Sequence, residues 1–154
     1  MRHLCRVLCS VAMVVTTVAG CGGSATTPSG QSTGAVFPLT VSRTGGVAGF
    51  RDVLVVSASG LVSVARKGQQ PRQCRLTPAV TRQLTAAAAT VPWSRITPAS
   101  THASFPDDLV STVASPAGGP VRLENPQAGA AGQLLLELLN DVSEPATSRL
   151  CRAV

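Results

Sequence analysis

The sequence predicts an α+β fold in which an antiparallel sheet of about five strands is packed by two helices. Two kinds of observation support this prediction. Runs of β-branched residues alternate with polar residues and are separated by glycine-rich turns, which is typical of β-hairpins. Two other segments carry apolar residues at helical spacing, and each follows a Thr-Pro or Asn-Pro pair. The expected order of elements is β-β-β-α-β-β-α, within one domain of residues 36–154.

The first three strands are expected before residue 67. The first alternates apolar and polar residues and ends at the glycine-rich segment Thr44–Gly49, and the next two flank Ala58-Ser59-Gly60, which indicates a hairpin. The polar segment 67–75 is expected to be a loop. The three strands are expected at Val36–Arg43, Phe50–Ser57 and Leu61–Arg66.

The first helix is expected to begin at Thr77-Pro78, because Thr is a favoured N-cap and Pro is favoured at the first helical position. Pro92 ends it. Trp93, which follows directly, is expected in the core, and an exposed tryptophan that binds a partner is the alternative.

The second half of the domain is expected to hold a hairpin and a helix. Leu109–Ala114 and Pro120–Glu124 pair around Ala117-Gly118-Gly119 in this prediction. The last helix is expected to begin at Asn125-Pro126 and to end at Pro145. Its apolar face is formed by Leu134, Leu135, Leu138, Leu139 and Val142.

The N-terminus resembles the signal peptide of a bacterial lipoprotein. Residues 1–6 are basic, and the 13 apolar residues that follow are fewer than the roughly 20 of a membrane-spanning helix. The next residues, Val18-Ala19-Gly20-Cys21, are similar to a lipobox. The resemblance implies cleavage after residue 20, lipidation of Cys21, and an anchor in the outer face of the cell membrane. An ordinary signal peptide with an incidental cysteine, or a buried hydrophobic helix, are the alternatives.

A flexible tether is expected over residues 21–35. After Cys21 it contains only small or uncharged polar residues and shows neither helical nor strand periodicity. Gly22–Ala35 is 14 residues long. A chain of this kind has a root-mean-square span of about 20 Å. The tether would therefore hold the domain close to the membrane without fixing it there.

The cysteines indicate one disulfide. Of five cysteines, Cys5 and Cys9 belong to the signal peptide and Cys21 is the expected lipidation site, which leaves Cys74 and Cys151. An even pair in an exported protein favours a disulfide bond. A metal site is the alternative, but two isolated cysteines and one histidine, His102, do not have the spacing of a zinc site.

The charge pattern argues against nucleic-acid binding. The whole chain carries a formal charge of +6, and from Cys21 onward 11 Lys and Arg stand against 7 Asp and Glu, a net charge of +4. These basic residues are spread along the chain, whereas a nucleic-acid binder concentrates them on one face. We therefore expect no nucleic acid among the partners.

The sequence offers little for catalysis. His102 is the only histidine after residue 20, and the motifs of hydrolases, zinc proteases and P-loop proteins are absent from the chain. Asp107 and Asp108 are adjacent, so on an extended chain they point to opposite sides. The glycines of Thr44–Gly49 precede an expected strand and not a helix, which does not suit a phosphate site. We expect no enzyme, no cofactor and no metal.

The segment Val41–Phe50 resembles the N-terminal signature of emfourin-like proteins, the protealysin-inhibitor family. The family pattern is Arg, Ser or Thr, Gly-Gly-Phe-Ala-Gly and a hydrophobic residue, and here Val47 stands where the family has Phe. The later layout is also similar, with an acidic start of a strand at residues 106–109, a hairpin and a leucine-rich helix. The resemblance covers about residues 39–142. It implies a small inhibitor of thermolysin-like zinc metallopeptidases.

The resulting hypothesis is a membrane-anchored lipoprotein whose small domain binds a metallopeptidase or another envelope protein. The expected partner-binding residues are Thr44, Gly45, Gly46, Val47, Ala48 and Gly49. In the alternative reading of this segment, its glycines only permit the chain to reverse. The alternative functions are a lipoprotein that carries a small ligand or lipid, and an envelope structural protein. A carrier needs a large apolar cavity, which few bulky side chains are present to line.

Overall fold

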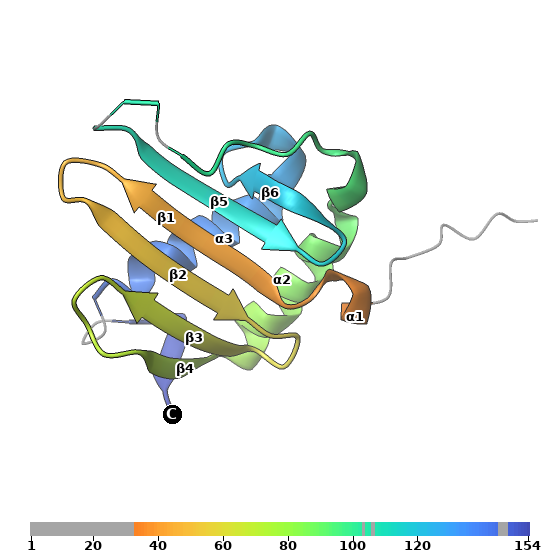
Figure 1. Ribbon diagram of the computed structural model, residues 1–154. Coiled ribbons are helices and arrows are strands. Elements are labelled where there is room, and N and C mark those ends of the chain that lie inside the picture. The colour runs from red at the N-terminus through yellow and green to blue at the C-terminus, as the bar shows by residue number, and fades with distance from the viewer. Residues whose placement is uncertain (1–32, 103, 106, 145–147) are drawn as a thin grey trace, which may run out of the picture.

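The computed structural model describes residues 33–102, 104–105, 107–144 and 148–154 (Figure 1). The expected signal peptide, Cys21 and the tether up to residue 32 lie outside the described residues. The strands are β1 (Leu39–Gly45), β2 (Phe50–Val56), β3 (Leu61–Arg66), β4 (Arg72–Leu76), β5 (Leu109–Ser115), β6 (Gly118–Arg122) and β7 (Cys151–Ala153). The helices are α1 (Thr33–Val36), α2 (Pro78–Thr90) and α3 (Gly129–Asp141), with 3-10 turns at Trp93–Arg95 and Pro126–Ala128.

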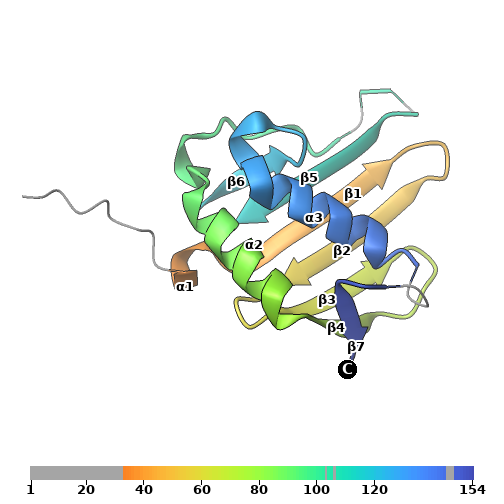
Figure 2. The same cartoon turned by 180° about the vertical axis from the view of Figure 1, so that it is seen from behind.

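The domain has two layers. Seven antiparallel strands form one sheet in the order β6-β5-β1-β2-β3-β4-β7. Helices α2 and α3 cross one face of the sheet, which we call the inner face, and no helix among the described residues covers the outer face (Figures 1 and 2). The predicted α+β class, with an antiparallel sheet and two main helices, is confirmed.

The predicted number and order of strands are wrong. Residues 67–75 do not form one loop, because Arg72–Leu76 is strand β4, between β3 and β7. Only Cys74 and Leu76 of β4 face the core, and polar side chains occupy the outward positions, so the strand has almost no apolar signal. Strand β7 has three residues, too few for a period to appear. The observed order is β-β-β-β-α-β-β-α-β after the short helix α1.

The predicted helix boundaries are largely confirmed for α2. The hydroxyl of Thr77 accepts a hydrogen bond from the N–H of Val80, and Pro78 occupies the first helical position. The last helix begins later than expected. Asn125-Pro126 starts a 3-10 turn, and α3 begins at Gly129, whose φ of 50° separates the two segments. A positive φ favours glycine, so Gly129 marks the boundary between the two segments.

The core lies between the inner face and the two helices. Trp93 is fully buried beneath the end of α2, and its indole N–H donates to the carbonyl of Ala88, so the prediction that Trp93 belongs to the core is confirmed. Apart from Phe37, the other large buried side chains of this layer are aliphatic. They include Leu39, Val41, Leu54, Val56, Val62 and Val64 from the sheet and Leu84, Leu135, Leu138 and Leu139 from the helices.

The domain begins at one end of the sheet. Helix α1 includes three residues of the expected tether, and a cis Phe37–Pro38 peptide bond joins it to β1, which begins at Leu39 and not at Val36. Strand β1 runs from this end to the hairpin that joins it to β2. We call the end that holds α1 the anchor end and the opposite end the hairpin end; Figure 1 shows them at opposite ends of the strands.

Cys74 and Cys151 form a disulfide bond, as predicted, with sulfur atoms 1.99 Å apart and Cα atoms 5.5 Å apart. The bond joins β4 to β7 and not a loop to the chain terminus. Cys151 lies opposite Leu76 in the ladder, so the two cysteines are diagonal neighbours on the inner face. The terminal strand is therefore held covalently to the edge of the sheet.

Candidate functional site

The hairpin end carries the segment that the sequence singled out. Gly45 pairs with Phe50, and residues 46–49 form the turn between them. Gly46 and Gly49 have φ values of 69° and 60°, which favour glycine. Val47 projects from the turn and is 95% exposed, and Ala48 is also exposed. An exposed valine at a turn is unusual because polar residues serve a turn equally well.

Two further apolar side chains lie at this end. Leu109 pairs with Gly45 across the β1–β5 ladder and is 48% exposed. Phe105 is 67% exposed, and its turn is held by Asp108, whose N–H donates to the Phe105 carbonyl. The Asp108 carbonyl in turn accepts from Gly46 N–H. We call Val47, Ala48, Phe105 and Leu109 the tip surface.

The turn offers side chains and not a free backbone edge. Gly46 N–H donates to Asp108 and Gly49 N–H donates to the Gly46 carbonyl, both at 2.8 Å. These two backbone donors are therefore already used within the domain. The most exposed apolar side chain of the turn is that of Val47.

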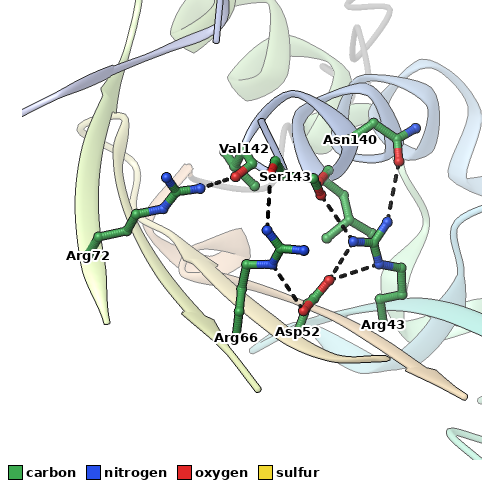
Figure 3. A network of polar contacts seen from close by, with 8 residues as sticks. Arg43, Asp52, Arg66, Arg72, Asn140, Val142 and Ser143 are labelled. Atoms are coloured by element: carbon green, nitrogen blue, oxygen red, sulfur yellow. Dashed lines mark hydrogen bonds and ion pairs between the residues drawn. The ribbon is translucent and has the colours of Figure 1, made fainter. Parts of the chain in front are cut away.

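At the hairpin end, a cluster of charged side chains lies between the sheet and the C-terminal end of α3 (Figure 3). Arg43 and Asp52 are 7% and 3% exposed and face each other across the β1–β2 ladder. Nε of Arg43 donates to Asp52 Oδ2 at 3.0 Å, and Nε of Arg66 lies 3.3 Å from Asp52 Oδ1. One carboxylate therefore compensates two guanidinium groups. Breaking such a buried pair leaves an uncompensated charge, which is costly.

The same arginines bind the C-terminal end of α3. The carbonyl of Ser143 accepts from Arg66 at 3.1 Å, and that of Val142 accepts from Arg72. The Ser143 hydroxyl accepts from Arg43 at 3.0 Å. The last carbonyls of a helix have no partner within it and carry partial negative charge, so cations are favourable there. The cluster therefore fixes α3 to three strands at the hairpin end.

Phe50 connects this cluster to the turn. The guanidinium carbon of Arg43 lies 4.4 Å from the centre of the Phe50 ring, which is a cation–π contact. A Cβ atom at Gly46 would lie 3.4 Å from both the Phe50 ring and Leu109 Cδ1. The turn therefore packs against the side chains of Phe50 and Leu109, and the Phe50 ring packs against the buried Arg43. This support favours a turn with a fixed shape.

The remaining candidate residues lie beside the hairpin end on the outer face. Thr44 belongs to β1, and its hydroxyl donates to the Thr101 carbonyl at 3.1 Å. His102 and Arg51 line a groove of about 630 Å³ there. Asp107 is exposed, and Asp108 Oδ2 accepts from Phe105 N–H. Of the predicted segment, Thr44 and Gly45 therefore belong to the sheet, and only Val47 and Ala48 are fully exposed.

A second carboxylate, Asp141, holds the segment before β7. Its oxygens accept from the Ser148 hydroxyl and from the N–H groups of Arg149 and Leu150. Burial acts to raise the pKa of Asp141, but these hydrogen bonds outweigh it and the pKa is lowered. The ionised carboxylate therefore ties the end of α3 to the terminal strand.

The sequence held a signal for the charge cluster that the prediction missed. Arg43 continues the inward series of Leu39 and Val41, and Asp52 begins the inward series of Leu54 and Val56. Opposite charges at core-facing positions of two paired strands indicate a buried ion pair. The contribution of Phe105 and Leu109 had no comparable signal, because it depends on the pairing of β5 with β1.

Within the described part of the chain, no group of three or more His, Cys, Asp or Glu residues could hold a metal ion. No helix among the described residues is long and apolar enough to cross a membrane. Comparisons with protein-family models, curated proteins and solved structures found no significant match to the chain.

Proposed function

We propose that the chain is an exported lipoprotein, anchored through Cys21, whose domain binds a protein partner through the tip surface. The observation that carries the proposal is the nearly complete exposure of Val47 on a turn that packs against Phe50 and Leu109. Preorganised apolar side chains lose little conformational freedom on binding, and this favours affinity. The proposed partner is a thermolysin-like metallopeptidase, as the resemblance to emfourin-like proteins implies.

Charge and shape at the hairpin end support a protein partner. Three exposed apolar side chains come from two separate segments, and Arg51 and Lys67 are exposed next to the turn. Interfaces commonly combine apolar anchors with a polar rim. We therefore expect the partner to receive the tip surface in a cleft that is apolar at its centre. The side of that cleft that faces β2 and β3 should be acidic.

The position of helix α1, where the domain begins, supports an orientation in which the tip surface faces away from the membrane. Helix α1, which follows the proposed tether, lies at the anchor end (Figure 1). Strand β1 spans the distance to the hairpin end in seven residues, about 20 Å at 3.3 Å per step. A partner outside the cell membrane would thus meet the tip surface before it meets the anchor.

The test of binding compares two substitutions of the same kind in the chain from residue 22 onward. This form keeps the whole described core, which lies between Val36 and Cys151. Val47→Asp places a charge at the turn, and Val55→Asp places one on the outer face, where Val55 is 37% exposed. We expect Val47→Asp to weaken inhibition of a thermolysin-like metallopeptidase at least tenfold, about 1.4 kcal/mol or more, while Val55→Asp inhibits normally.

Thermal unfolding of both variants serves as the control, and we expect both to melt close to the wild type. Absence of inhibition by the wild type at high micromolar concentration would reject the metallopeptidase as the partner. Equal inhibition by the wild type and both variants would place the interface outside the tip surface.

The anchoring part of the proposal has its own test. Cys21→Ser removes the thiol that would carry the lipid, so the full chain should move from the detergent phase to the aqueous phase on phase partitioning, because an acyl anchor supplies the membrane affinity. An unchanged distribution would reject lipidation of Cys21.

A further inference from the structure

The anchor end carries an exposed pair of like charges. Arg75 of β4 and Arg152 of β7 are directly opposite each other in the ladder, and both side chains are exposed. Like charges at opposed positions destabilise a sheet. No ion pair within the described residues involves either side chain. An anion that binds both guanidinium groups would remove this repulsion.

The two strands that carry the pair contain no acidic residue, although Asp141 accepts from Leu150 N–H just before β7. No Asp or Glu occurs between Asp52 and Asp107, or after Glu144, so β3, β4, α2 and β7 contain none. Arg82 of α2 is also exposed in this part of the molecule. The hairpin end holds charges of both signs, because Asp107 is exposed and Asp108 half-buried there beside the exposed Arg51 and Lys67. The pair at the anchor end differs in having no acidic residue on its own strands.

The two arginines line a surface hollow of about 300 Å³, together with Leu76, Thr77 and Pro78. The hollow lies where β4 leads into α2. β1, β2, β3, β4 and β7 are consecutive in the sheet. Four strand spacings separate β1 from β7, which is about 19 Å.

We infer that Arg75 and Arg152 bind the phosphodiester headgroups of an anionic membrane, and so hold the anchor end of the domain against the bilayer. This inference builds on the proposed anchoring, because the tether brings this end within about 20 Å of the lipid surface. Arginine forms bidentate contacts with phosphate oxygens, and a basic residue near an anionic surface adds to membrane affinity. The tip surface then points away from the membrane.

The test measures vesicle binding of the chain from residue 22 onward, which has no lipid. The vesicles contain two-thirds phosphatidylcholine and one-third phosphatidylglycerol, and pure phosphatidylcholine vesicles are the neutral control. We expect binding to the anionic vesicles alone, with affinity that falls as salt is added. Arg75→Gln with Arg152→Gln should weaken binding by about fivefold for each arginine, about 25-fold together.

The matched control removes the same charge from the other end of the sheet, by Arg51→Gln with Lys67→Gln. These residues lie beyond a Debye length of about 8 Å from the anchor end, so we expect less than a threefold change. Equal weakening by the two double variants would overturn the inference, since net charge alone would then explain binding. Binding to neutral vesicles with the same affinity would also overturn it.

Two further outcomes separate this inference from the proposed function. Arginine-dependent binding of inorganic phosphate without vesicle binding would assign the pair to a soluble anion and reject the membrane. Because the assay uses neither Cys21 nor a peptidase, failure of lipidation or of inhibition would leave its result unchanged. Arginine-dependent vesicle binding would stand even if the tip surface bound no peptidase.

Discussion

The two ends of the sheet place charge and apolar surface in opposite ways. At the hairpin end, Arg43 and Asp52 are buried and Val47 is exposed. At the anchor end, Trp93 and Val36 are buried and Arg75 and Arg152 are exposed. The anchor end follows the usual distribution of a folded domain, and the hairpin end reverses it. The buried charges hold α3 to the sheet, whereas the exposed apolar side chains add nothing to the core, which is consistent with the binding surface that we propose.

The largest expected effect comes from removing the shared carboxylate of the buried charge cluster at the hairpin end. Asp52→Ala should lower the free energy of unfolding by about 3–5 kcal/mol, because Arg43 and Arg66 lose their common carboxylate in a buried site. Urea unfolding measures this loss. The anchor-end variant Arg75→Gln is the comparison and should change stability by less than about 0.5 kcal/mol. If Asp52→Ala changed the free energy of unfolding by a similarly small amount, water would be replacing the carboxylate. The two ends would then not differ in how charge contributes to stability.

The second effect concerns the covalent link of β7 to β4. Cys74→Ala with Cys151→Ala should lower the free energy of unfolding by about 2–4 kcal/mol. Wild type unfolded in a reducing agent should match the double variant, and mass spectrometry without reduction should show the bond in the wild type. The same unfolding midpoint for oxidised wild type and the variant would contradict the prediction. With the bond absent, Arg152 should also bind vesicles less well, because its strand is less firmly held.

The third effect depends on pH. The pKa of Asp141 is lowered from its ordinary value of 3.8 in the folded chain, so the ionised form stabilises the fold above that value and this contribution is lost as the pH falls through the folded-state pKa. Asp141→Asn should therefore reduce stability at pH 7, by less than about 1 kcal/mol for a partly exposed group. The difference between the wild type and the variant should shrink as the pH falls below 3.8 and should vanish once the pH is below the folded-state pKa of Asp141. A constant difference from pH 7 to pH 2 would exclude ionisation as its cause.

The smallest effect has the opposite sign. Arg152→Glu places opposite charges across the β4–β7 ladder, where Arg75 and Arg152 now repel, so stability should rise by about 0.2–1 kcal/mol. The same variant should lose affinity for anionic vesicles. Thermal unfolding and vesicle binding of one protein thus test whether the pair is kept for binding at a cost to stability. A lower melting temperature would show that the pair does not repel in the wild type.

The outline of the fold could be predicted where side chains repeat on one face. The hairpin of β2 and β3 and the start of α2 follow from alternation and from Thr77-Pro78, because these signals are local. Strand β4 could not be predicted in this way. It has two core-facing residues, and its place depends on pairing with β3 and with residues of β7 that are more than 70 positions away in the sequence.

The candidate site could be predicted only in part for the same reason. The glycines of the turn and Val47 are contiguous, so the sequence alone identifies them. Phe105 and Leu109 join them only through the ladder between β1 and β5. The alternating pattern in β1 and β2 does contain Arg43 and Asp52, but a search for apolar repeats passes over charged residues at core-facing positions.

The two borders of the sheet limit how copies of the protein can associate. Strand β6 contains Pro120, which has no N–H, and the Pro120 carbonyl accepts from Ala99 at 2.7 Å. At the other border, β7 is three residues long and is held by the disulfide. Short or blocked edge strands resist pairing between molecules. Proteins anchored in a bilayer are crowded in two dimensions, where exposed strand edges would favour aggregation. If the chain is anchored as we propose, these borders would keep neighbouring copies separate.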